Sequence, residues 1–184
     1  MELQENNDFV RIGEVTLKTF RMVNGEKVYF DYFKKNNLIV EAGRAVLMDL
    51  MLGLTRKKLT FIDWGKGGAE FFPKGDPLQE IKPDDADTAL YDFALRKELN
   101  AFNRLSPTSV SYTETLISDE VDSDINEAAM IFEDPQTKEQ SIFARITFPT
   151  VRLLIDKGMG IELTWVFNFK KIRTKEECMA EGDE

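Results

Sequence analysis

The sequence predicts a mainly β fold: an antiparallel β-sandwich with one or two helices, with an α+β arrangement as the alternative. Short runs of β-prone residues recur along the 184-residue chain and are separated by turn residues. Every second side chain is apolar in residues 159–171, which is the clearest strand pattern in the chain. These apolar residues are Ile161, Leu163, Trp165, Phe167 and Phe169. A helical period is clearest in residues 37–53.

Residues 9–33 are predicted to form a β-hairpin. Asn24-Gly25 lies between two β-prone runs, and this dipeptide favours a type I′ turn because both central residues need a positive φ. The first strand has one irregularity in its alternation, which we place near Gly13.

Residues 37–53 are predicted to be an amphipathic helix. Asn36 or Asn37 is the expected N-cap, and Gly53 suits the C′ position, where a positive φ is needed. Gly43 inside the helix costs about 1 kcal/mol relative to Ala, so we expect another backbone to approach the helix there. The apolar residues recur at spacings of three and four: Leu38, Ile39, Ala42, Val46, Leu47, Leu50 and Met51.

A short strand is predicted at residues 59–64, followed by the sequence GKGG at 65–68. The GK[ST] ending of a phosphate loop is missing and no helix is predicted to follow, so we exclude a phosphate site. Residues 69–88 are predicted to be a surface loop or insertion. In this loop Phe71 and Phe72 either tuck inward or form a contact patch.

Further along, residues 89–103 are predicted to be a second helix. Four strands are predicted in the remainder, at residues 108–118, 125–133, 140–148 and 159–171. We therefore expect one β-rich domain over residues 1–173, with an inserted region at about 69–105. The acidic tail at 174–184 lies outside it.

The charge of the chain limits its partners. The net charge is −9, with a pI near 4.7, and the longest basic cluster is Arg56-Lys57-Lys58. Binding to nucleic acid needs a basic stripe, so nucleic acid is not an expected partner. No apolar run reaches the roughly 20 residues that a membrane-spanning helix requires. The first residues lack the charged and apolar regions of a signal peptide, so no membrane partner is expected.

Residue types also limit the chemistry. The chain has no histidine, which removes the commonest general base and the commonest transition-metal ligand. The one cysteine, Cys178, cannot form a disulfide within the chain, and its neighbours Glu176 and Glu177 disfavour the thiolate. We find no serine-nucleophile or paired-carboxylate motif. The sequence therefore predicts neither an enzyme nor a cofactor.

The sequence VDSDINEAAMIF at residues 121–132 offers a possible calcium loop. Asp122, Asp124, Asn126 and Glu133 occupy positions 1, 3, 5 and 12, but position 6 needs glycine for its sharp turn and is Glu127. The apolar run after Glu127 predicts an acidic turn that leads into a strand. No metal site is predicted, although a looser cation site at residues 119–124 stays open.

Buried positions supply the other candidate residues. Trp64 and Trp165 are predicted to be core or interface anchors. Arg145 lies within the apolar strand sequence FARITF, where a lone charge needs a partner. Glu127 on a neighbouring predicted strand is the expected partner, in a pair that sets strand register and does no chemistry.

Three C-terminal segments resemble a strand trio of tailed-bacteriophage virion proteins: INEAAMIF, SIFARITFPTV and GIELTWVFNF. NLIVEAGRAVLMDLMLG followed by FIDWGKGG also resembles the opening helix of such domains, and together these segments cover about half of the chain. Where a Gly-Leu-Phe ending is usual, this chain has Ala129-Met130-Ile131-Phe132. The matching residues are Ile125, Glu127, Phe132, Phe143, Ala144, Arg145, Phe148, Leu163, Trp165 and Phe169.

The resemblance implies a structural protein of the virion, assembled in the host cytoplasm. A neck or collar subunit that packs with copies of itself in a ring is the leading expectation. Its other partners would be portal, neck, tail or fibre proteins. A baseplate or tail-fibre adaptor is one alternative. A second is a host-surface β-sandwich that binds carbohydrate or a cation through Trp64, Phe71, Phe72 and the acidic loop 119–124.

Overall fold

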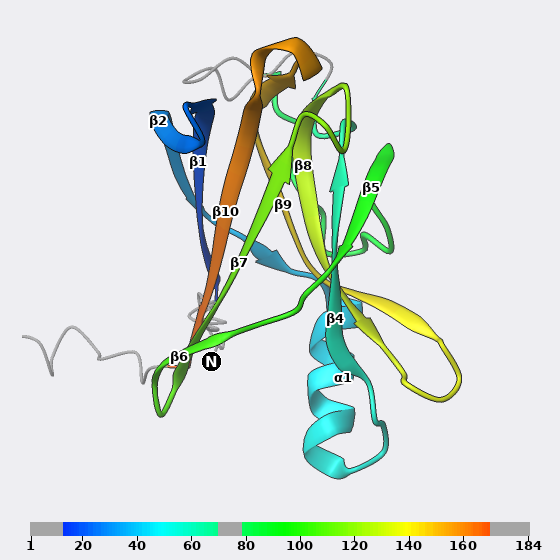
Figure 1. Cartoon of the computed structure of the whole chain (residues 1–184). Coiled ribbons are helices and arrows are strands. Elements are labelled where there is room, and N and C mark those ends of the chain that lie inside the picture. Colours follow the sequence, from blue (N-terminus) through cyan, green and yellow to red (C-terminus); the bar gives the residue numbers. More distant parts are fainter. Residues whose placement is uncertain (1–12, 70–78, 170–184) are drawn as a thin grey trace, which may run out of the picture.

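The computed structural model describes residues 13–69 and 79–169, which form two five-stranded antiparallel sheets and one helix (Figure 1). The mainly β fold and the sandwich predicted from the sequence are confirmed. One sheet has the order β2-β1-β10-β7-β6 and the other has the order β3-β9-β8-β4-β5. The first sheet contains β1 (Gly13–Val23), β2 (Glu26–Asn36), β6 (Asn103–Ser106), β7 (Ser109–Ile117) and β10 (Met159–Asn168). The second contains β3 (Leu38–Ile39), β4 (Lys58–Gly65), β5 (Phe93–Glu98), β8 (Ser123–Glu133) and β9 (Gln140–Leu153).

The predicted hairpin is present as β1 and β2. Asn24 and Gly25 have φ values of 53° and 85°, as a type I′ turn requires. The irregularity was misplaced, because Gly13 pairs regularly with Phe167 and the shift in register lies between Thr19 and Phe20. Phe30 is the extra residue of β2 at that shift, and a bulge of this kind increases the local twist.

The helix α1 (Glu41–Leu52) begins later than predicted. Neither Asn36 nor Asn37 is the N-cap: Val40 is, and it makes no side-chain capping bond. The reason is that Leu38 and Ile39 pair with β9 as the short strand β3, so the helix cannot begin before this pairing ends.

Both predictions for glycines in this segment are confirmed. Gly53 ends the helix with a φ of 70°. A Cβ atom on Gly43 would lie 2.2 Å from the carbonyl oxygen of Phe143, so α1 lies directly against the backbone of β9.

The predicted helix at 89–103 is wrong. Residues 93–98 of this segment form β5, which pairs with β4, and its last residue, Asn103, begins β6, which pairs with β7. Arg96 of β5 bonds to Asp63 of β4, whereas the next residue, Lys97, bonds to the carbonyl oxygen of Thr115. These strand pairings and side-chain contacts outweigh a weak helical pattern.

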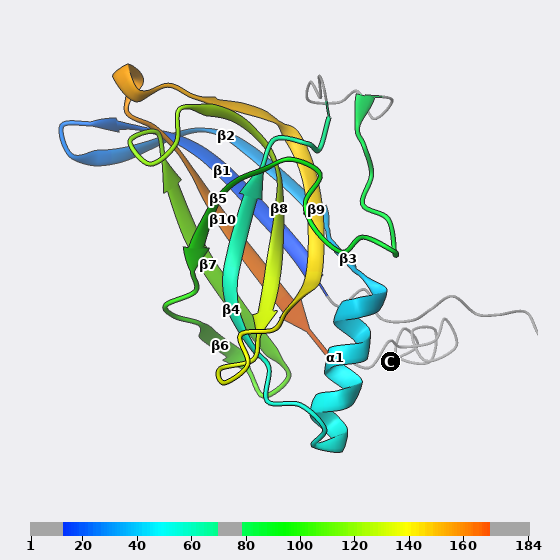
Figure 2. The same ribbon diagram turned by 90° about the vertical axis from the view of Figure 1, so that its right-hand side faces the viewer.

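The sheet that contains β8 is covered on both of its faces. Ala128, Met130 and Phe132 belong to the main core between the two sheets. Ala129 and Ile131 pack on the outer face with Val40. Figure 2 shows α1 and the segment before β5 on that side. Double coverage explains why β8 has an apolar run where a half-exposed strand would alternate.

A register shift also occurs between Met130 and Ile131, with Phe143 as the extra residue on β9. This irregularity forms although residues 129–132 contain no glycine. Within residues 13–69 and 79–169, no helix has the length and apolarity that crossing a membrane would require.

Candidate functional site

A buried charge cluster lies on the outer face of the second sheet, beneath the segment that precedes β5. Arg145 donates to Glu127 Oε2 from Nε at 3.0 Å and from a terminal nitrogen at 2.6 Å. Its other terminal nitrogen donates to Asp87 Oδ2 at 2.7 Å. Arg145 and Glu127 have no exposed side-chain surface. The predicted pair is therefore present, and Asp87 is a member that sequence reasoning missed.

Every charged group of this cluster has partners. Glu127 Oε1 accepts from the backbone N–H groups of Gly67 at 2.9 Å and Asp92 at 3.0 Å. The Arg145 guanidinium stacks over the Tyr91 ring at 3.9 Å. Burial lowers the pKa of Arg145, but the hydrogen bonds to Glu127 and Asp87 outweigh burial and leave the pKa above its ordinary value. The cluster therefore holds β8, β9 and the segment before β5 together. We call these contacts the buried lock.

The GKGG turn supplies part of this lock. A Cβ atom on Gly65 would lie 2.6 Å from Glu127 Oε1, and one on Gly68 would lie 2.4 Å from the carbonyl oxygen of Asn126. Gly68 N–H donates to the Asn126 side chain at 2.8 Å. The glycines thus let the turn approach β8, and their N–H groups bind protein carbonyls and carboxylates.

The segment before β5 is held at a second place by α1. Arg44 makes two hydrogen bonds of 2.7 Å to the Asp85 carboxylate, and Glu41 N–H donates to the Asp85 carbonyl. The Arg44 hydrogen bond lowers the pKa of Asp85 below its usual value. Part of the predicted insertion is therefore attached to both the helix and the sheet.

The other predicted residues are not brought together. Trp64 and Trp165 are both fully buried in the main core, so they are core anchors in this structure. A sugar ring cannot stack on Trp64, because its side chain has no exposed surface. Phe71 and Phe72 lie outside the described residues.

The carboxylates of the acidic turn at 119–124 do not converge on a common ion site. Asp124 is bound by Arg152 through two hydrogen bonds of 2.7 and 2.8 Å, and the Arg152 hydrogen bond lowers the pKa of Asp124. Asn126 instead bonds to Gly68 and Ala69. In the part of the chain that the structure describes, no group of three metal-ligating side chains could hold an ion.

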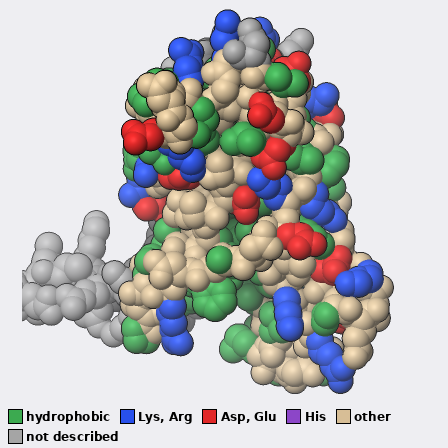
Figure 3. Space-filling model, in the orientation of Figure 1, with side chains coloured by type: hydrophobic (Ala, Val, Ile, Leu, Met, Phe, Trp, Pro, Cys, Tyr) green, Lys and Arg blue, Asp and Glu red, His purple; other side chains and the backbone are tan. Residues whose placement is uncertain are grey.

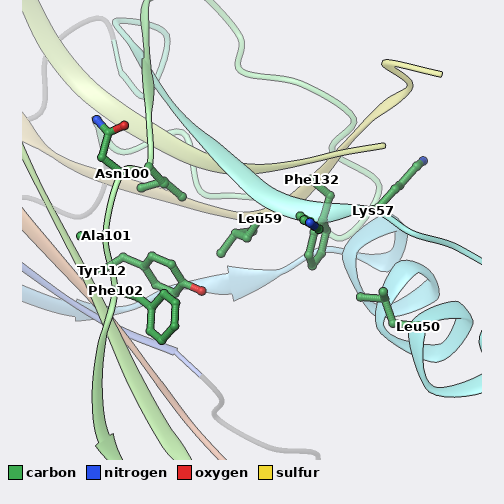
Figure 4. Close-up of a pocket in the computed structure, with 10 residues that line it drawn as sticks. Leu50, Lys57, Leu59, Asn100, Ala101, Phe102, Tyr112 and Phe132 are labelled. Atoms are coloured by element: carbon green, nitrogen blue, oxygen red, sulfur yellow. The ribbon is translucent and has the colours of Figure 1, made fainter. Parts of the chain in front are cut away.

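An apolar cleft of about 520 Å³ opens at the end of the sandwich that carries α1 (Figure 4). We call it the basal cleft. Its walls come from α1, the start of β4, the connection between β5 and β6, β7 and the end of β8. Figure 3 shows hydrophobic side chains gathered in the notch at this lower end. The lining includes Leu50, Lys57, Lys58, Leu59, Phe102, Tyr112 and Phe132.

The base of this cleft is a chain of aromatic contacts that continues into the core. The ring of Phe102 lies 6.2 Å from that of Tyr112, which lies 6.2 Å from Phe167. Phe167 contacts Phe143 at 4.9 Å, and Phe143 contacts Phe132 at the same distance. Burial raises the pKa of the Tyr112 phenol, which keeps this group neutral. The cleft is therefore supported by the packed core.

A second apolar surface lies at the opposite end of the molecule. The β1–β2 hairpin projects beyond the second sheet (Figure 2). On this hairpin Arg21, Val23, Val28 and Phe30 line an open hollow of about 260 Å³. We call this the hairpin hollow. Its outer side is braced, because Phe20 contacts Tyr29 edge-to-face and Lys27 bonds to Glu162.

Sequence reasoning missed both surfaces, although the sequence carries a signal for the hairpin hollow. Four of the five residues at 28–32 are apolar or aromatic, where a strand with one solvent face would alternate. At the basal cleft, Leu50 of α1 and Phe102 are 37% and 67% exposed. Exposed apolar groups of this density mark interaction surfaces.

No protein-family model, curated protein or solved structure matches the chain. The function is therefore inferred from these surfaces and from the strand resemblance described above.

Proposed function

We propose that the protein is a structural subunit of a tailed-phage virion, most specifically a neck or collar subunit that packs with copies of itself in a ring. The observation that carries the proposal is the pair of exposed apolar surfaces at opposite ends of the chain, the hairpin hollow and the basal cleft. The resemblance of three strands to phage virion proteins supports the same assignment. It would assemble in the host cytoplasm and reside in the virion.

Two different surfaces suit a ring better than a twofold dimer. A twofold interface uses one surface twice, whereas a ring joins one surface of each subunit to a different surface of the next. The two ends of this chain differ in shape: one is a projecting hairpin and the other is a recess. That difference favours head-to-tail contact.

The buried lock supports a structural role for the sandwich itself. Glu127, Arg145 and Asp87 tie a long connecting segment to the sheet, and α1 holds the same segment through Arg44. Segments that are held in this way lose little further conformational entropy when the subunit assembles. The net charge of −9 also keeps free subunits soluble before assembly.

An adaptor in the baseplate or at a tail-fibre attachment is the alternative. The different shapes of the two surfaces would suit an adaptor as well as a ring subunit, if each surface binds a different virion protein. In that case the purified chain would stay monomeric and would bind baseplate or fibre components.

The proposal is tested by measuring the mass of the full chain across a wide concentration range by light scattering, followed by negative-stain microscopy. We expect closed rings of uniform size to form as the concentration rises. A chain that stays monomeric, and that does not bind purified portal or neck protein, would contradict the ring proposal.

A further inference from the structure

We propose that the tip of the β1–β2 hairpin of one copy inserts into the basal cleft of the next copy. This inference rests on the proposed ring function and names its contact. Each copy would then offer one hairpin and one cleft, and residues around Val28 and Phe30 would pack against the aromatic side chains of the cleft.

The tip of the hairpin is held by contacts within its own sheet. Its turn residues Asn24 and Gly25 have the positive φ values of a tight turn. Tyr29 and Lys27 both bond to Glu162, at 2.8 and 2.9 Å, and Met22 N–H donates to the carbonyl of Gly158 at 2.9 Å. Because the hairpin is already ordered, its insertion into a partner costs little conformational entropy.

The hairpin exposes apolar groups that the described part of its own chain leaves uncovered. Val28 and Phe30 are 50% and 56% exposed, and both line the hairpin hollow. The hollow faces away from Tyr29, whose ring lies with Phe20. An apolar surface on a projecting element is typical of an interface with another protein.

The cleft offers a matching receptor. It is open and already formed, and its volume of about 520 Å³ lies within the range of pockets that hold drug-sized ligands. Phe102, 67% exposed on one wall, and Leu50 on the opposite wall leave apolar surface for an inserted group.

The charges at the two ends also complement each other. Glu26 is exposed beside the hairpin turn, and Lys58 lies at the cleft. One contact between opposite charges is therefore available.

A second copy is the occupant that the arrangement favours. The hairpin and the cleft lie at opposite ends of the sandwich, so a chain cannot place its own hairpin in its own cleft (Figure 1). A chain that carries both halves of a contact which it cannot close on itself assembles head to tail.

Two full-length variants test the contact. Phe30→Glu disables the hairpin, and Phe102→Glu disables the cleft. Both residues are exposed, so each variant should melt within a few degrees of the wild type. Phe93→Glu is the matched control, because Phe93 is 55% exposed on β5 and lies in neither surface. Light scattering and sedimentation then measure the masses of each protein and of mixtures.

We expect each of the two variants to be monomeric, with association weakened by roughly thirtyfold or more, as at a binding hot spot. An equimolar mixture should form a one-to-one dimer and nothing larger, because one intact hairpin and one intact cleft remain. Phe93→Glu should form the wild-type oligomer.

Different failures point to different conclusions. If the wild type forms an oligomer that both variants also form, the contact is wrong while the ring proposal stands. A mixture that stays monomeric also overturns the contact, because a head-to-tail interface must be restored by mixing. A wild-type chain that is monomeric at all concentrations overturns the ring proposal and this contact with it.

Discussion

Arg145 and Glu127 are joined by two hydrogen bonds between neighbouring strands, and neither side chain is exposed to solvent. They are diagonal neighbours on one face, because Arg145 lies opposite Ala129 and Glu127 lies opposite Thr147. Asp87 approaches the same guanidinium from the segment before β5. One arginine thus holds both the strand register and the connection that covers the sheet.

Replacing Glu127 by Ala should lower the free energy of unfolding by about 3–5 kcal/mol, because Arg145 would lose its closest counter-charge in a buried site. Urea denaturation at pH 7 measures the change. Asp124→Ala is the control, since its partner Arg152 is 67% exposed, and its loss should be below about 1 kcal/mol. Equal losses in the two variants would show that Glu127 is not a buried structural partner.

Asp87→Asn should loosen the segment before β5 without unfolding the sandwich. The variant keeps the shape of the side chain but removes the charge that faces Arg145. Hydrogen exchange should become faster at the Ile81 and Glu41 amides, whose bonds hold this segment. Amides of β8 and β10 should exchange as in the wild type. Asp122→Asn, in an exposed turn, is the control. Unchanged exchange at Ile81 and Glu41 would argue against the tether.

Gly43→Ala should destabilise the protein, although the same change stabilises an isolated helix by about 1 kcal/mol. The added methyl group would lie 2.2 Å from the Phe143 carbonyl oxygen, so α1 must move away from β9. We expect a loss of about 1–3 kcal/mol in thermal or urea unfolding. Ala45→Gly, at an exposed helix position, isolates the effect of helix propensity and should cost about 1 kcal/mol. A stabilised Gly43→Ala protein would rule out the tight contact.

The stability that Glu162 gives to the hairpin, through its bonds with Lys27 and Tyr29, should depend on pH. Burial raises the pKa of Glu162, but hydrogen bonds from Lys27 and Tyr29 outweigh burial, so the pKa lies below 4.5. A lowered pKa means that the folded state favours the carboxylate. The stabilisation is therefore complete above about pH 4.5 and is lost as the pH falls through the lower folded value.

Glu162→Gln should accordingly be less stable than the wild type by roughly 1–2 kcal/mol at pH 7, and this difference should shrink as the pH falls through the lowered pKa of Glu162. Urea unfolding across this range measures the difference. Glu98→Gln, exposed on β5, should show no such dependence. If Glu162→Gln and the wild type differ in unfolding free energy by the same amount at every pH, the Glu162 carboxylate does not stabilise the hairpin.

Local patterns in the sequence determined the hairpin turn, the last strand and the helix end, because each depends on a few adjacent residues. Asn24-Gly25 specifies a turn by its φ values, and Gly53 ends α1 for the same reason. The pairing of Glu127 with Arg145 was also predictable, since a charge within an apolar strand requires a partner.

Tertiary structure decided the features that depend on residues distant in the chain. Residues 93–98 form β5 because β4 offers an edge to pair with, and Asn103 begins β6 beside β7. The helix α1 begins late because Leu38 and Ile39 pair with β9 as β3. Asp87 joined the cluster only because its segment crosses the outer face of the sheet. The hairpin hollow and the basal cleft arise where one sheet extends past the other and where the helix extends past both. A sequence states which residues are apolar, but only the packed sheets decide which of them remain uncovered.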